Sequence, residues 1–141
     1  MNTLPNFHYL VGETIMFCQC IEHDIKLIYA GMLKGDFNKN FQEVEDNPLG
    51  PVLKKLEDLD NSDGNPHLST GDYDLLDKIR DIRNHWAHKA YIKFVYSKGN
   101  LYDKNFLQQL RRLENDHNRL AKLSDNIEKV RLDVLKKYNR I

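Results

Sequence analysis

Six consecutive residues, Arg83-Asn84-His85-Trp86-Ala87-His88, bring together a guanidinium, an amide and two imidazoles. A guanidinium neutralises phosphate oxygens through paired donors, and an imidazole exchanges a proton near neutral pH. Together these groups suit the handling of a phosphodiester. The residue types predict His88 as a proton carrier and Arg83 as the group that stabilises charge on the phosphate.

The relative directions of these side chains depend on whether the backbone that carries them is helical. Residues 73–82 contain no glycine or proline and follow a helical pattern, so the string is expected on helical backbone. On that helix Asn84 and His88 are one turn apart and share a face, with Arg80 one turn earlier. Arg83 lies to one side of that face, about 140° from His88 at about 100° per residue.

The interior of the string holds further candidates. Asn84 is unfavourable inside a helix because it competes for backbone hydrogen bonds, so its presence suggests that it orients His88 or holds a ribose hydroxyl. His85 is a candidate second imidazole. Trp86 continues the apolar line of the preceding turns and is expected in the core. Purely structural roles, a helix-stabilising His88 and a surface ion pair of Arg83, are the alternatives.

The Arg-Asn-x-x-x-His string, on a helix that reads Leu-Leu-Asp-Lys-Ile-Arg-Asp-Ile, resembles the signature of HEPN domains. Many of these all-helical proteins are metal-independent endoribonucleases of toxin–antitoxin, abortive-infection and CRISPR systems. The resemblance makes Arg83 the motif arginine, Asn84 the polar position after it and His88 the motif histidine. It extends to the order of helices along most of the chain.

The same resemblance implies two accessory positions. An acidic residue at a place comparable to Glu22 often contacts the motif arginine, which implies a Glu22–Arg83 pair; a helix-edge glutamate in water is the alternative. Some HEPN toxins carry a tyrosine two residues after the motif histidine, where a partner nucleotidyltransferase attaches AMP. Here that position is Ala90 and the tyrosine is Tyr91, a departure from the pattern.

The function implied is RNA cleavage by attack of the ribose 2′-hydroxyl, without a metal or cofactor. The match supplies one motif histidine, whereas this chemistry benefits from an acid and a base. A homodimer with a composite site is therefore expected. An antitoxin protein is a further expected partner. The alternative is a non-catalytic HEPN-like module that binds RNA, a nucleotide or a protein.

Length and composition limit the number of domains and the classes of protein to consider. With 141 residues, 40% hydrophobic and 30% charged, the chain is expected to form a single domain over 1–141. It has no apolar run of the roughly 20 residues that span a bilayer, and no secretory signal, which predicts a cytoplasmic protein without membrane contact. Cys18 and Cys20 lack further ligands at zinc spacing and are expected as buried helix cysteines, so no metal site is predicted.

Charge is unevenly distributed although the net charge is zero. Residues 36–77 carry 3 basic against 11 acidic side chains, whereas residues 78–102 carry 6 against 1 and residues 103–141 carry 10 against 6. A local basic patch around the motif suits a polyanion such as RNA. The alternative is that the acidic and basic segments pair with each other or between subunits.

Four helical segments position the motif. Apolar three- and four-residue steps predict helices over 5–33, from Pro48 to about residue 59, from Ser69 or Thr70 to about Tyr96, and from about Asp103 almost to the end. The stretch 36–47 is expected as a loop or short helix. The expected fold is an all-α, HEPN-like four-helix up-down bundle with a long C-terminal helix.

Overall fold

The computed structural model describes residues 3–141. The helices in this range are α1 (Leu4–Met32), α2 (Phe37–Val44), α3 (Leu49–Asp60), α4 (Thr70–Leu76), α5 (Ile79–His88) and α6 (Asn100–Lys137). An all-helical chain with a long C-terminal helix is therefore confirmed. None of the helices in the described range is both long and apolar enough to cross a membrane.

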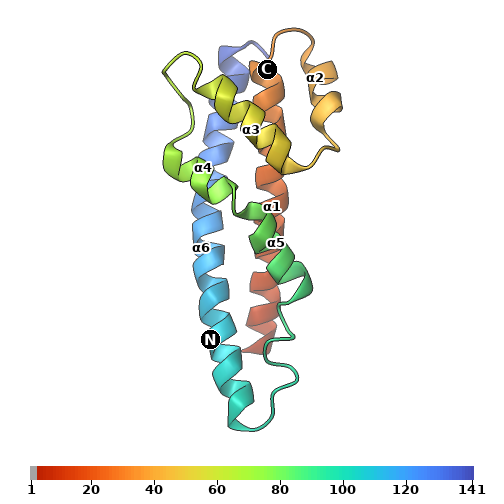
Figure 1. The fold of residues 1–141 in the computed structure, drawn as a ribbon, viewed down its shortest axis with the longest axis vertical. Helices are drawn as coiled ribbons and strands as arrows, with labels where there is room; N and C mark the ends of the chain where they lie inside the picture. Colours follow the sequence, from red (N-terminus) through yellow and green to blue (C-terminus); the bar gives the residue numbers. More distant parts are fainter. Residues whose placement is uncertain (1–2) are drawn as a thin grey trace.

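The long helices α1 and α6 lie side by side and form the spine of the molecule (Figure 1). Both carry the predicted apolar stripe, since their buried side chains recur at three- and four-residue steps. Each fully buried aliphatic side chain contributes about 1.5–3 kcal/mol. The stripe consists mainly of Val11, Cys18, Ile21, Ile25 and Ile28 on α1 and of Leu113, Leu120, Ile127 and Val134 on α6.

The shorter helices pack against this spine. α1 contacts α2, α3 and α5 as well as α6, so it is the central element of the fold. α3 and α4 cross one half of the long pair, and α5 continues toward the other end (Figure 1). At the far end of α1, Arg140 donates hydrogen bonds to the carbonyls of Gly31, Leu33 and Gly35, and so joins the C-terminus to the end of α1.

The predicted single helix from residue 70 to about Tyr96 is wrong, because the structure divides it into α4 and α5. Its start is as expected: Ser69 caps α4 in a reciprocal capping box with Asp72. The helix then tightens, since the Lys78 N–H bonds to the Leu75 carbonyl, one residue nearer than in an α-helix. The turn lets Leu76 and Ile79 both reach the core.

α5 also ends earlier than predicted, at His88. The next eight residues form turns that bury Ala90 and Phe94. The Phe94 ring packs edge-on against Phe7 at 5.3 Å and against Phe106 at 5.1 Å between ring centroids. Aromatic contacts with both helices of the spine, at the end where α1 and α6 begin, therefore redirect the chain out of the helix.

The two cysteines differ in environment. Cys18 is buried as predicted, and burial raises the pKa of its thiol to about 12. Cys20 is exposed, so the prediction of a buried residue is wrong there; two residues further along a helix, its side chain points away from the core.

Candidate functional site

The candidate residues of α5 lie on two sides of the helix and border two different pockets. Arg80 and Arg83 line a pocket between α1, α3 and α5, hereafter the Glu22 pocket. Asn84, His85 and His88 line a pocket between α5 and α6, hereafter the His88 pocket. Asn84 and His88 thus share a face, as their one-turn spacing predicts, and Arg83 lies off that face.

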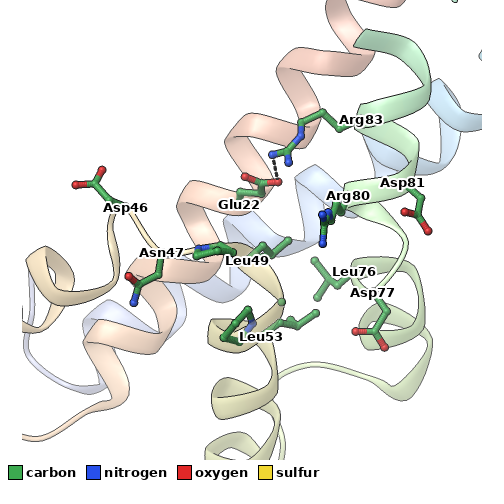
Figure 2. A pocket seen from close by; sticks show the side chains of 13 residues that line it. Glu22, Asp46, Asn47, Leu49, Leu53, Leu76, Asp77, Arg80, Asp81 and Arg83 are labelled. Atoms are coloured by element: carbon green, nitrogen blue, oxygen red, sulfur yellow. Dashed lines mark hydrogen bonds and ion pairs between the residues drawn. The ribbon is translucent and has the colours of Figure 1, made fainter. Parts of the chain in front are cut away.

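The Glu22 pocket has a volume of about 740 Å³. Figure 2 shows Arg83 reaching from α5 to Glu22 on α1, with Leu49 and Leu53 of α3 among the residues that line the pocket. The Arg83 guanidinium donates a hydrogen bond to the Glu22 carboxylate, so the ion pair implied by the family resemblance is present. Four carboxylates and two guanidiniums line this pocket: Glu22, Asp46, Asp77, Asp81, Arg80 and Arg83.

The His88 pocket has a volume of about 540 Å³ and a different lining. Besides the three motif-region residues it contains Lys89 at the end of α5 and Arg112 from α6. Asp81 contributes the single carboxylate in that lining. The pocket therefore combines two imidazoles, an amide and two fixed cations, a set that can hold an anion and exchange a proton beside it.

His85 is the buried imidazole of this pocket. Its Nε2 lies 3.2 Å from Oε1 of Gln109 on α6, and only 7% of the residue is exposed. Burial lowers the pKa of His85, and the neighbouring charge of Arg112 lowers it further, whereas the hydrogen bond to Gln109 acts in the opposite direction. The shift favours the neutral imidazole, which leaves one ring nitrogen able to accept a proton.

Trp86 fixes the orientation of α5 on α6. It is buried, as predicted, and its Nε1–H donates to Asp116 of α6 at 2.9 Å. The Arg112 guanidinium lies over the Trp86 ring, 5.9 Å from its centroid. Arg112 is absent from the sequence-based candidates, because it is distant in sequence from the motif and only the packing of α5 on α6 brings it there.

Tyr91 lies outside the linings of both pockets. Its hydroxyl is 2.7 Å from Nδ1 of His8 near the start of α1, and burial raises the pKa of Tyr91. The accessory role considered for Tyr91 stays a prediction, because modification by a partner enzyme does not require a place in either pocket. His117 on α6 is partly buried and forms a hydrogen bond with Glu13 on α1.

Within residues 3–141, no group of three or more histidine, cysteine or acidic side chains is arranged to hold a metal ion. No protein-family model matches the chain, and neither a curated protein nor a solved structure matches it. The geometry of the two pockets and the motif on α5 are thus the observations from which a function can be argued.

Proposed function

We propose that the protein is a metal-independent RNA endonuclease of HEPN type and that cleavage takes place at the His88 pocket. One observation carries this proposal: a single open pocket is lined by His88, His85 and Asn84 together with two fixed cations. Phosphodiester transfer needs this combination, since charge develops on phosphate oxygens while protons leave one oxygen and reach another.

The proposed reaction is an internal transesterification. A base removes the proton from the ribose 2′-hydroxyl, and the 2′-oxygen attacks phosphorus. The bond from phosphorus to the 5′-oxygen breaks, and an acid donates a proton to that leaving oxygen. The products are a 2′,3′-cyclic phosphate and a 5′-hydroxyl. His88 would carry a proton, and Asn84 would position the sugar or the imidazole.

The HEPN resemblance supports this assignment in two ways. Arg83 is oriented by Glu22, the arrangement that the resemblance implies for a motif arginine that stabilises charge on phosphate oxygens. In addition, we propose that α3 with the divided α4–α5 is a shortened second helix pair beside α1 and α6, which gives a HEPN-like four-helix up-down bundle.

The proposed assembly is a cytoplasmic homodimer in which the motifs of two subunits face one cleft. A twofold axis would bring together Arg83 and His88 from both chains, although in one chain they border different pockets. An antitoxin that covers the cleft is the partner expected for a toxin of this class. Sedimentation velocity measures the assembly directly: a single species with the mass of one 16.7 kDa chain would contradict the dimer.

The test of the function is cleavage of single-stranded RNA by the purified protein in excess chelator. His88→Ala should abolish cleavage without lowering the melting temperature, because His88 is exposed. His23→Ala is the matched control, since this histidine of α1 is also exposed and lines neither pocket. Intact RNA after incubation with folded wild-type protein, or equal cleavage by His88→Ala, would refute the proposal.

A non-catalytic binding module is the second candidate. The placement of Arg83 favours it, because this arginine is engaged by Glu22 in a different pocket from His88. Such a module would bind RNA, a nucleotide or a protein and leave RNA intact. Binding of uncleaved RNA by wild-type protein, lost on substitution of His88, would identify it.

A further inference from the structure

The two pockets on α5 have opposite charge. In the Glu22 pocket, acidic side chains outnumber basic ones by four to two, and Glu22 already neutralises Arg83. In the His88 pocket, two fixed cations oppose the single carboxylate of Asp81. A phosphate group is therefore repelled by the lining of the first pocket and attracted by that of the second.

The two cations of the His88 pocket are available to a ligand. Within the described range, 3–141, neither Arg112 nor Lys89 forms an ion pair. The Arg112 guanidinium lies over the Trp86 ring, 5.9 Å from its centroid, and no hydrogen bond within residues 3–141 occupies its N–H donors. The nearby Asp116 carboxylate is occupied by Trp86 and Arg119.

The two imidazoles of the pocket come from one helix of the same chain. His85 and His88 are three residues apart on α5 and both border the space that Arg112 and Lys89 line. The hydrogen bond between His85 and Gln109 holds the buried ring in place, whereas His88 is exposed. An acid and a base can therefore come from a single subunit.

From this arrangement we infer that the His88 pocket is a phosphate-binding site complete within one chain, in which Arg112 and Lys89 hold the phosphate oxygens beside His85 and His88. The inference rests on the proposed function for the identity of the ligand as an RNA phosphodiester. It assigns the phosphate contacts to Arg112 and Lys89, where the sequence pattern points to Arg83. In the proposed dimer, the shared cleft then holds two such phosphate-binding sites, one from each subunit.

The first experiment measures binding without cleavage. Inorganic phosphate, or a 2′-O-methyl oligoribonucleotide that cannot be cleaved, is titrated while the ring proton signals of His85 and His88 are followed by NMR. The wild-type signals should shift and saturate. Arg112→Gln and Lys89→Gln should each weaken binding about tenfold, the loss of one charge-assisted contact.

Arg111→Gln is the matched control, since Arg111 is also exposed on α6 but lines neither pocket; its affinity should equal that of the wild type. Lys89 follows the last helical residue of α5 and is exposed, so Lys89→Gln remains informative if Arg112→Gln unfolds the protein. Wild-type ring signals that do not respond, or binding lost in Arg83→Gln but retained in both Lys89→Gln and Arg112→Gln, would overturn the inference.

These experiments distinguish failure of the inferred phosphate site from failure of the proposed nuclease activity. Phosphate bound through Arg112 and Lys89 by a protein that leaves RNA intact would refute only the nuclease. RNA cleavage that is unaffected in Arg112→Gln and Lys89→Gln would refute only the inference.

A mixing experiment then tests completeness within one chain. When inactive His88→Ala subunits are combined with weakened Arg112→Gln subunits, every single-chain site keeps one defect, so cleavage should not exceed that of the Arg112→Gln subunits alone. Random exchange between subunits would restore about a quarter of wild-type cleavage if His88 of one chain worked with Arg112 of the other. Such recovery would overturn the inference.

Discussion

At the scale of single residues, Arg83 joins α5 to α1 whether or not it also meets a substrate. Its side chain is 33% exposed and that of Glu22 is 16% exposed, so water screens the pair only partly. We expect a coupling of about 1–2 kcal/mol between Glu22→Gln and Arg83→Met in a double-mutant cycle of urea unfolding, between the values for exposed pairs and for buried charged hydrogen bonds.

The pair of Glu128 and Arg131 on α6 is the control for that cycle. Its nitrogen–oxygen distance is 3.8 Å and the glutamate side chain is 58% exposed, so the coupling should stay below about 0.5 kcal/mol. Equal coupling in the two cycles would show that the Glu22–Arg83 contact stabilises the fold no more than an exposed ion pair does.

His85 gives a pH dependence whose sign follows from its burial. Its pKa in the folded protein is lowered from 6.5, chiefly by desolvation, so the unfolded chain binds a proton there more readily. The stabilising contribution is therefore present above pH 6.5 and is lost as the pH falls through the lowered pKa. The free energy of unfolding of the wild type should decrease toward acid more steeply than that of His85→Gln. Parallel pH profiles from denaturant unfolding would contradict this.

At the scale of helices, the hydrogen bond from Trp86 to Asp116 helps to orient α5 on α6, together with the hydrogen bond between His85 and Gln109. Both residues are buried, so Asp116→Ala leaves the indole N–H without an acceptor, at a cost of about 1–3 kcal/mol. Trp86 is the single tryptophan of the chain, and its fluorescence therefore reports both the local environment and unfolding. Asp125→Ala, at an exposed position of the same helix, should leave stability and emission unchanged.

The helix boundaries show which features of the fold local sequence signals can predict. The long helices could be predicted because a buried stripe and a capping residue are local signals, as with the Ser69 cap of α4. The turn at Lys78 and the end of α5 at His88 could not, because no glycine or proline marks them. They arise from distant packing, such as that of Phe94 on Phe7.

In the candidate site, too, some residues could be predicted from local sequence and others depend on tertiary packing. The spacing on one helix placed Asn84 and His88 together, and the family resemblance supplied Glu22 as the partner of Arg83. Arg112 could not be found in this way, because its proximity to the histidines depends on how α5 lies against α6. Local periodicity determines the face of a helix, and only tertiary packing determines what that face meets.

At the scale of the whole molecule, the uneven distribution of charge along the sequence becomes an uneven distribution of charge over the surface. The acidic segment 36–77 forms α2, α3 and α4 with their loops, across one half of the spine (Figure 1). The basic residues after it lie on α5, on α6 and in the turns that join them. RNA should therefore bind along the α5–α6 side and avoid the α2–α4 side.

Salt dependence tests this arrangement. Each phosphate contact of a single strand contributes about 0.7 to the slope of log affinity against log salt, because it releases condensed counterions. With an uncleavable oligoribonucleotide, Lys89→Gln and Arg112→Gln should each reduce the magnitude of the slope by about that amount. Lys54→Gln and Lys55→Gln, at exposed positions of α3, should leave it unchanged, because they lie within the acidic segment. Fluorescence anisotropy over a range of salt concentrations provides the slopes. Equal reductions on both sides would mean that RNA follows the overall charge of the surface and does not recognise the α5–α6 side.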